Sequence, residues 1–262
     1  MPSVLAVVVT FNSGDHIASC TLALEQSVSD FALTTVVVDN ASEDTTRALI
    51  EASGISNVQS DTNDGYAFAI NRVSSRIIEN DYVLIINPDV KLRHDTLRLL
   101  IAGLESDDSL GAVGPVLEGP HFSPNGRRCV SWPVFCLHYV LKNAWKRNPF
   151  TLWYYNLLWT KDRENVDWLS GCCLLIRKAA YFDCEGFDDR FLLYFEDVAF
   201  GVMLRARGWS NRLVESAVAD HVGGGSTATL TIKKRVFTHA SSALSFYYRY
   251  YPIHKGLRRV RR

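Results

Sequence analysis

The sequence feature that most constrains the fold is a regular alternation of short apolar runs and helical patterns over residues 1–117. Runs rich in Val, Ile and Leu are typical of strands buried on both faces, whereas apolar residues three or four positions apart are typical of amphipathic helices. The expected strands are Val4–Val9, Thr34–Val38, residues 55–60, Tyr82–Ile86 and Ala112–Leu117. Helical patterns between them cover residues 13–28, 42–54, 66–77 and 97–104. Because strands alternate with helices, we predict an α/β fold with a mostly parallel central sheet and helices on both faces.

The second half of the chain is less regular. Residues 118–165 contain four prolines and four tryptophans without a repeat of strand and helix, so we expect an excursion of loops with one or two helices. Order returns after Val166. Residues 172–176 then have the pattern of a strand, and residues 196–208 have that of a helix that ends at Gly208.

Short polar motifs directly follow four of the predicted strands. They are Thr10-Phe11-Asn12, Asp39-Asn40, Asn63-Asp64-Gly65 and Asn87-Pro88-Asp89. The carboxyl ends of parallel strands meet at one edge of a sheet, where α/β proteins bind ligands, so we expect these motifs to line one crevice. Taken singly, each acid is more readily interpreted as a helix cap or a turn residue than as part of a site. Four polar strand ends on one edge favour a binding site.

The residue types in this crevice suit a nucleotide. Asp39 can accept a hydrogen bond from the imide N–H of a pyrimidine, and the ring of Phe11 can stack on a base. Asp89 can hold a hard divalent cation through oxygen, and that cation would neutralise a diphosphate. The chain has no GxxxxGK[ST] loop and no GxGxxG motif after its first strand, which argues against a P-loop NTPase and a Rossmann dehydrogenase.

Three further residues in the second half of the chain are candidates for catalysis or metal binding. Glu196 and Asp197 open the helix predicted at residues 196–208, where acids either stabilise the helix dipole or act in catalysis. His221 follows a short predicted strand, and it is either a core or surface histidine or a ligand for a metal such as manganese. The local pattern leaves both alternatives open for each residue.

Charge and hydropathy limit the partners. Lys plus Arg and Asp plus Glu both number 28, so a nucleic-acid partner is not expected. Residues 255–262 hold five basic residues and no acid, which is typical either of a tail that contacts anionic lipid or of a solubilising end. The N-terminus lacks a signal-peptide pattern and no run of about 18 apolar residues occurs, so we expect a cytoplasmic protein without a spanning helix.

Six longer motifs occur along the chain in a fixed order. They are VVVTFNSGDHI, VVVDNASEDTT, NDGYAFAINR, LIINPDV, WLSGCCLLIRKAAYFDCEGFDDRFLLYFEDV and DHVGGGS. Together they resemble the family 2 glycosyltransferases, which are nucleotide-sugar transferases with the GT-A fold, and in particular the bacterial rhamnosyltransferase-like branch. The resemblance covers residues 3–227. It implies a metal-dependent, inverting transfer of a sugar from a nucleoside diphosphate to an acceptor hydroxyl.

The resemblance also implies a division of the chain and a role for each motif. A GT-A domain would cover residues 1–227, with a nucleotide-binding half (1–117), the aromatic-rich excursion (118–165) and an acceptor and catalytic half (166–227), followed by a basic helical segment (228–262). Thr10, Phe11, Asn12 and Asp39 would lie near the base, while Asn63, Gly65, Asn71 and Asn87 would line the donor pocket. Asp89 and His221 would hold a divalent metal, Mn or Mg, and Asp197 of the pair Glu196-Asp197 would be the general base. Asn87 and Ala199 stand where many relatives carry acids.

Donor, acceptor and partners are predicted from the same branch. It implies a deoxysugar donor such as dTDP-rhamnose and the synthesis of a surface glycan. Rings and basic residues combine in residues 132–159 and 245–262, which suits a lipid-linked acceptor and contact with the anionic inner face of the cell membrane. The alternative for these residues is a hydrophobic core with a homodimer interface. Two other functions stay open, a nucleotidyltransferase (although its Gly- and Lys/Arg-rich phosphate loop is absent) and a non-catalytic scaffold that binds sugar nucleotides.

Overall fold

A central sheet of eight strands organises the fold. It is seen in a computed structural model that describes the chain except residues 28–29, 121–124, 145–147, 159–165, 224–231 and 261–262. The strand order is β3-β2-β1-β4-β9-β6-β10-β5. These strands are β1 (Ser3–Thr10), β2 (Ala32–Asp39), β3 (Ser56–Gln59), β4 (Tyr82–Ile86), β5 (Val90–Leu92), β6 (Leu110–Glu118), β9 (Cys173–Arg177) and β10 (Ser210–His221). Two short strands, β7 (Gly126–Arg127) and β8 (Trp168–Leu169), form a separate antiparallel pair.

Parallel pairing dominates the central sheet, as the sequence predicted. β1 pairs in parallel with β2 and β4, β2 pairs with β3, and β6 pairs with β10. β9 runs antiparallel between β4 and β6, and β5 runs antiparallel to β10. The short strand β5 therefore brings the end of β10 beside the residues that follow β4.

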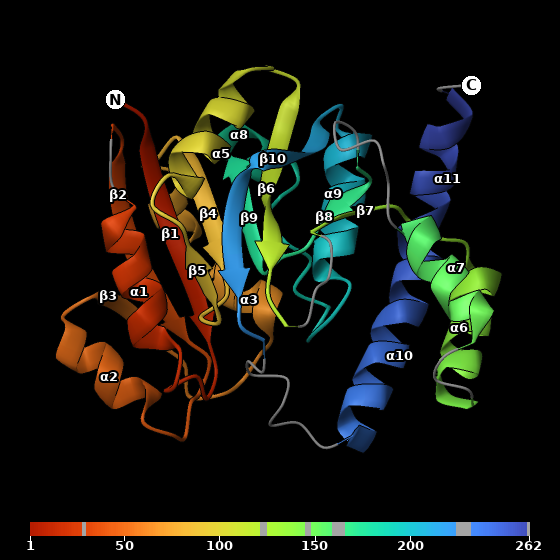
Figure 1. Ribbon diagram of the computed structural model, residues 1–262, viewed down its shortest axis with the longest axis horizontal. Coiled ribbons are helices and arrows are strands. Elements are labelled where there is room, and N and C mark those ends of the chain that lie inside the picture. The colour runs from red at the N-terminus through yellow and green to blue at the C-terminus, as the bar shows by residue number, and fades with distance from the viewer. Residues whose placement is uncertain (28–29, 121–124, 145–147, 159–165, 224–231, 261–262) are drawn as a thin grey trace.

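Helices cover both faces of the sheet (Figure 1). They are α1 (Ile17–Gln26), α2 (Thr46–Ser53), α3 (Tyr66–Asn71), α4 (Ser74–Ile77), α5 (Thr96–Glu105), α6 (Trp132–Ala144), α7 (Pro149–Leu158), α8 (Lys178–Asp183), α9 (Glu196–Ala206), α10 (Ile232–Arg249) and α11 (Tyr251–Val260). The sequence pattern predicted one helix over residues 66–77, but the structure has two. The N–H of Val73 bonds the carbonyl of Ile70, three residues back, and this tighter turn separates α3 from α4.

Two hydrophobic cores lie on the two faces of the sheet. Val4 and Val8 of β1 belong to the core that α1 and α5 cover, whereas Leu5 and Val9 belong to the core that includes α3 and α8. Successive side chains of a strand point to opposite faces. A strand that serves two cores is apolar throughout, which explains the continuous run at the N-terminus.

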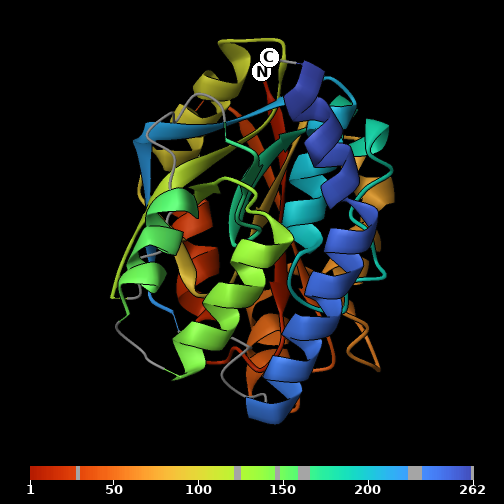
Figure 2. The ribbon, with the colours of Figure 1, turned by 90° about the vertical axis from the view of Figure 1, so that its right-hand side faces the viewer.

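Four helices, α6, α7, α10 and α11, form an additional layer on one side of the molecule (Figure 1, Figure 2). Aromatic rings join this layer internally and to α9, since the ring centroid of Phe135 lies 5.4 Å from that of Tyr247 and 5.8 Å from that of Phe195. Among the described residues, no helix is both long and apolar enough to cross a membrane. The domain boundaries predicted near residues 165 and 227 fall outside the described residues.

Candidate active site

A cavity, here called the strand-end cavity, opens where β1 ends, beside the end of β2. It is lined by Val9, Thr10, Phe11, Asn40, Asn63, Tyr66, Leu192, Leu193, Lys234 and Thr238. Two atoms of these lining residues, Thr10 Oγ1 and Asn40 Oδ1, are buried and have no hydrogen-bond partner among the described residues. Buried polar atoms are normally hydrogen-bonded, so both atoms mark positions where a polar ligand would bind.

The Asn63-Asp64-Gly65 motif is held at this cavity by hydrogen bonds from Asn40 and by the close approach of Gly65 to Leu192. Asn40 Nδ2 donates to Asn63 Oδ1 at 2.8 Å and to the carbonyl of Gly65 at 3.2 Å. Gly65 has a φ of 104°, and a Cβ there would lie 2.6 Å from the carbonyl oxygen of Leu192. Only glycine fits this approach. The close contact with Leu192 sets Asn63 in the cavity wall.

The residues expected near a base occupy different positions. Phe11 lines the cavity, as described above. Asn12 uses its Oδ1 to accept the N–H of Glu43 at 2.8 Å. Asp39 is fully buried and accepts from Arg47 Nε at 2.8 Å, and it is not among the described residues that line the cavity. Asn12 and Asp39 thus fix the strand-end loops, and their direct contact with a base stays a prediction.

Asn71 lies apart from the strand-end cavity. Its Nδ2 donates to the carbonyl of Phe187 at 2.7 Å, and its Oδ1 accepts from the hydroxyl of Tyr181 at 2.8 Å. The amide therefore ties α3 to the segment that follows α8. Asn71 is not among the described residues that line the strand-end cavity, and its contact with a donor stays a prediction.

Asp89 and His221, far apart in sequence, lie side by side. β5 pairs with β10 so that His221 is opposite Val90, and the N–H of Val222 donates to the carbonyl of Asp89 at 3.0 Å. His221 Nε2 lies 3.4 Å from Asp89 Oδ2, and only 4% of Asp89 is exposed. A carboxylate oxygen and an imidazole nitrogen in this arrangement fit a Mn²⁺ or Mg²⁺ ion.

A series of hydrogen bonds joins the Asn87-Pro88-Asp89 motif to the Glu196-Asp197 pair. The hydroxyl of Tyr66, which lines the strand-end cavity, lies 2.8 Å from Asn87 Oδ1 and 2.8 Å from the carbonyl oxygen of Gly171. The N–H of Gly171 donates to Asp197 Oδ2 at 3.0 Å. Burial, together with nearby negative charges that include Asp197 and Asp89, raises the pKa of Tyr66. The residues that follow β4 and the N-terminus of α9 therefore belong to one site.

The acid pair lies in a poorly solvated environment. Burial raises the pKa of both carboxyl groups, and the charge of Asp197 adds to the effect on Glu196. Glu196 Oε2 is buried without a hydrogen-bond partner among the described residues. Tyr194 and Phe195, directly before the pair, have φ values of 68° and 69°. Such left-handed backbone costs about 1–3 kcal/mol per residue and concentrates at functional sites.

A second cavity, here called the aromatic cavity, contains Glu196 and Asp197. Its other walls include Arg127, Trp168, Phe135, Tyr154 and Tyr247, so β7, β8, α6, α7 and α10 all contribute. The guanidinium carbon of Arg127 lies 4.9 Å from the ring centroid of Trp168. Burial lowers the pKa of Arg127, and the charge of Asp197 opposes this change. We did not predict Arg127 from the sequence, where the pair Arg127-Arg128 in the irregular excursion was the only available signal.

A third group of potential ligands includes Cys129, which also lines the aromatic cavity. Cys129, Asp167 and His254 bring their ligand atoms within 4.8 Å of one another. However, Asp167 Oδ1 pairs with the guanidinium of Arg205, and Asp167 Oδ2 accepts the N–H of Cys129 at 2.8 Å. A guanidinium at the carboxylate opposes a second cation, so we interpret this cluster as a structural link between α9, α11 and the segment after β7.

Comparisons with known proteins agree with this geometry. A family model described as "Glycosyltransferase like family 2" matches residues 2–244. The chain is 33% identical over 246 residues to N-acetylglucosaminyl-diphospho-decaprenol L-rhamnosyltransferase of Mycobacterium tuberculosis, covering 87% of this chain and 78% of the relative. It is 25% identical over 149 residues to rhamnosyltransferase WbbL of Escherichia coli K12, covering 56% of this chain and 54% of that protein.

A solved structure shares the fold. The mannosyltransferase PcManGT from Pyrobaculum calidifontis, in complex with GDP-Man and Mn²⁺, superposes with a TM-score of 0.58 at 19% identity, covering 84% of this chain and 57% of that one. This chain therefore spans less than two thirds of the solved relative, and the likeness supports the fold alone. Together with the family match, it shows that the chain is a member of the family 2 glycosyltransferases with the GT-A fold.

Proposed function

We propose that this glycosyltransferase is an inverting enzyme that transfers rhamnose from dTDP-rhamnose to a hydroxyl of a lipid-linked surface glycan. The observation that carries the proposal is the path from Asn87 through Tyr66 and Gly171 to Asp197, which sets a buried carboxylate beside the strand-end cavity. The names of two relatives, both rhamnosyltransferases, support the sugar. The name of the mycobacterial relative, which includes a diphospho-decaprenol, supports a lipid-linked acceptor.

The strand-end cavity would hold the donor. Phe11 would stack on the base, and the buried atoms Thr10 Oγ1 and Asn40 Oδ1 would bond polar groups of the nucleotide. Asp89 and His221 would hold Mn²⁺ or Mg²⁺ near the diphosphate. When bound, such a cation offsets the negative charge that grows on the leaving diphosphate.

Asp197 would act as the general base in a single displacement. It takes the proton of the acceptor hydroxyl while the acceptor oxygen bonds to the anomeric carbon. The bond from that carbon to the diphosphate oxygen breaks, and its electron pair leaves with the diphosphate. Attack from the face opposite the leaving group inverts the configuration. The N–H groups of Gly171 and Val198 hold the Asp197 carboxylate in orientation.

The aromatic cavity would receive the acceptor. It contains Asp197 together with several rings, whose faces suit the apolar faces of a sugar. A lipid-linked acceptor would place the enzyme at the inner face of the cell membrane. Homodimer formation stays a prediction.

Binding of sugar nucleotides tests the donor site. We expect a panel of dTDP-, UDP- and GDP-sugars to raise the melting temperature, most strongly for dTDP-rhamnose with Mn²⁺ present. Thr10→Val removes a buried acceptor oxygen from the cavity and should reduce the shift, whereas Thr21→Val, a buried threonine on α1, should not. No stabilisation by any nucleoside diphosphate sugar, with or without Mn²⁺, would contradict the proposal.

A further inference from the structure

Helix α10 exposes a stripe of large apolar side chains. Phe237, Leu244 and Tyr248 are 76%, 58% and 83% exposed. Their spacing of seven and four residues places them on one face of the helix. The surface helix of a soluble protein normally turns its apolar face inward, and α10 does this with Ala243 and Phe246. Its second, outward apolar stripe is therefore a contact surface.

Helices α6 and α7 also expose large apolar side chains. Val140 on α6 is 64% exposed, and Leu152 and Trp153 on α7 are 65% and 48% exposed. Both helices lie in the same layer as α10, on one side of the molecule (Figure 2). We define the outer helical face by Val140, Leu152, Trp153, Phe237, Leu244 and Tyr248.

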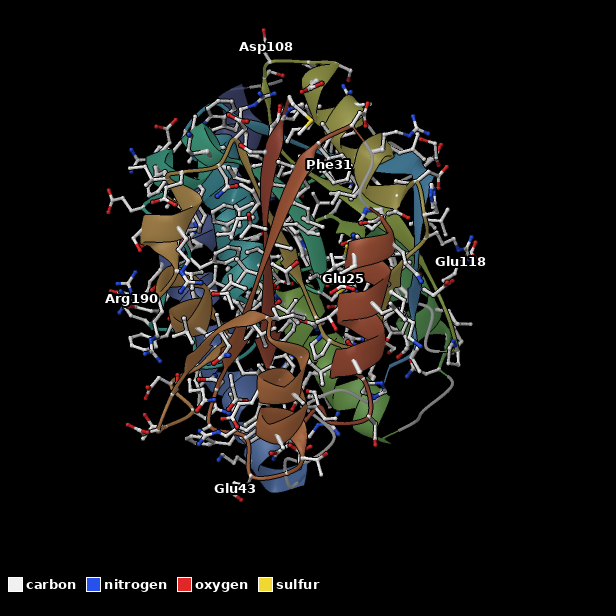
Figure 3. All side chains as sticks on the ribbon, turned by 90° about the vertical axis from the view of Figure 1, so that its left-hand side faces the viewer. Glu25, Phe31, Glu43, Asp108, Glu118 and Arg190 are labelled. Carbon is white, nitrogen blue, oxygen red and sulfur yellow. The ribbon has the colours of Figure 1, made fainter. Side chains whose placement is uncertain are left out.

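The charge of this layer identifies its partner. The sequences of α6, α7, α10 and α11 together contain eight Lys or Arg residues and no Asp or Glu, although the whole chain is neutral. Arg235 and Arg249 of α10 and Lys255 of α11 are exposed. Exposed acids such as Glu25 and Glu43 lie on the opposite side of the molecule (Figure 3), whereas Glu185 and Asp189 line a cavity with Tyr250, between α10 and α11. If a second copy bound to the outer helical face, two positively charged surfaces would face each other and repel. Anionic lipid would instead neutralise the positive charge of this surface.

The position of the layer relates this surface to the acid pair. The inward faces of three helices line the aromatic cavity, through Phe135 of α6, Tyr154 of α7 and Tyr247 of α10. The same helices carry the outer helical face on their outward sides. A lipid-linked molecule whose chain stays in a bilayer would therefore meet the protein at the layer that walls the cavity with Asp197.

We propose that the outer helical face docks on an anionic lipid bilayer, with aromatic and aliphatic side chains at headgroup level and basic residues on lipid phosphates. The docking itself rests on exposure and charge, and only its link to a lipid-linked acceptor rests on the function proposed above.

Vesicle co-sedimentation of the full chain tests the docking. Binding should be strong to vesicles of equal parts phosphatidylglycerol and phosphatidylcholine, weaker to pure phosphatidylcholine, and reduced by salt. The double variant Phe237→Ser/Tyr248→Ser should lower binding by about tenfold or more, because two large apolar contacts are lost. The matched control Leu22→Ser/Leu49→Ser alters exposed apolar residues on α1 and α2, away from this layer, and should bind like the wild type.

Two outcomes would overturn the docking proposal. One is equal vesicle binding by the wild type and the Phe237→Ser/Tyr248→Ser variant. The other is a dimeric wild type that becomes monomeric in this variant by light scattering, which would make a second copy the occupant. Transfer to a water-soluble acceptor fragment is measured in parallel. Vesicle binding without any transfer would count against the proposed function alone, and transfer without vesicle binding would count against the docking alone.

Discussion

At the scale of single residues, Asp197 is the centre of the site. Its two oxygens accept the N–H groups of Gly171 and Val198. An asparagine side chain has a single oxygen and can accept only one of these two hydrogen bonds. Asp197→Asn should lower the transfer rate by about 100- to 10,000-fold, because general-base catalysis is lost. The measurement is the initial rate at saturating donor, with circular dichroism as a check on folding. Asp108→Asn, a change at an exposed acid, is the control and should keep the wild-type rate (Figure 3).

The pH dependence of the rate reports on the same carboxyl group. Asp197 must be ionised to act, and burial raises its pKa, so activity should fall with acid at a pH above the ordinary aspartate range. Arg127 opposes this effect of burial. Arg127→Gln removes a positive charge, which raises the pKa of Asp197 further and moves the acid limb to higher pH. Arg127→Lys should restore the limb, and an unchanged profile in Arg127→Gln would refute this positioning role.

The proposed metal ligands, Asp89 and His221, can be tested by the affinity for Mn²⁺ without a measurement of catalysis. Asp89→Asn and His221→Gln should each weaken Mn²⁺ binding by about tenfold or more, since each removes one ligand. Titration calorimetry or the electron paramagnetic resonance signal of Mn²⁺, with a nucleoside diphosphate present, measures this affinity. Asp220→Asn changes an acid next to His221 that pairs with Arg93, and it should leave the affinity unchanged. Wild-type affinity in both ligand variants would exclude this metal site.

At the scale of elements, β1, β2 and β4 were predictable because each contains a continuous apolar run that is followed by a polar motif. The same rule placed Asp89 directly after a strand, and the pairing of β5 with β10 explains why His221 lies beside it. Tyr66 was assigned only to a helix face, because its helical spacing accounts for it without a further role. Arg127 lies in a region without periodicity. The role of Asn71 in the donor pocket stays a prediction, since its amide bonds Phe187 and Tyr181 and the sequence pattern could not indicate these partners.

The Asn63-Asp64-Gly65 turn offers a test at the same scale. Gly65→Ala should lower both stability and binding of sugar nucleotides, because its Cβ would lie 2.6 Å from the carbonyl oxygen of Leu192. Gly54→Ala is the matched control, since Gly54 also has a positive φ but no atom within 4 Å of the added Cβ. It should cost only the conformational strain of about 1–2 kcal/mol. Chemical denaturation and thermal shift measure the two effects, and equal losses in both variants would contradict the close-approach argument.

At the scale of the whole molecule, the two cavities and the outer helical face have separate proposed roles, which are donor binding, acceptor binding and membrane docking. The strand-end cavity lies at the carboxyl end of β1, and the aromatic cavity lies between the N-terminus of α9 with the pair β7–β8 and the helices α6, α7 and α10. Tyr66 and Gly171 connect the two cavities through hydrogen bonds. The donor would thus bind in the strand-end cavity and the acceptor in the adjoining aromatic cavity, and α10 lines both.

The anomeric configuration of the product shows whether the transfer is a single displacement with inversion. The full chain is incubated with dTDP-rhamnose, Mn²⁺ and an N-acetylglucosaminyl-diphospho-polyprenol in anionic vesicles, and the product is examined by NMR. We predict a rhamnosylated lipid whose anomeric configuration is opposite to that of the donor, formed by the wild type and by Asp108→Asn but not by Asp197→Asn. A product with retained configuration, or equal product from Asp197→Asn, would contradict single displacement with Asp197 as the base.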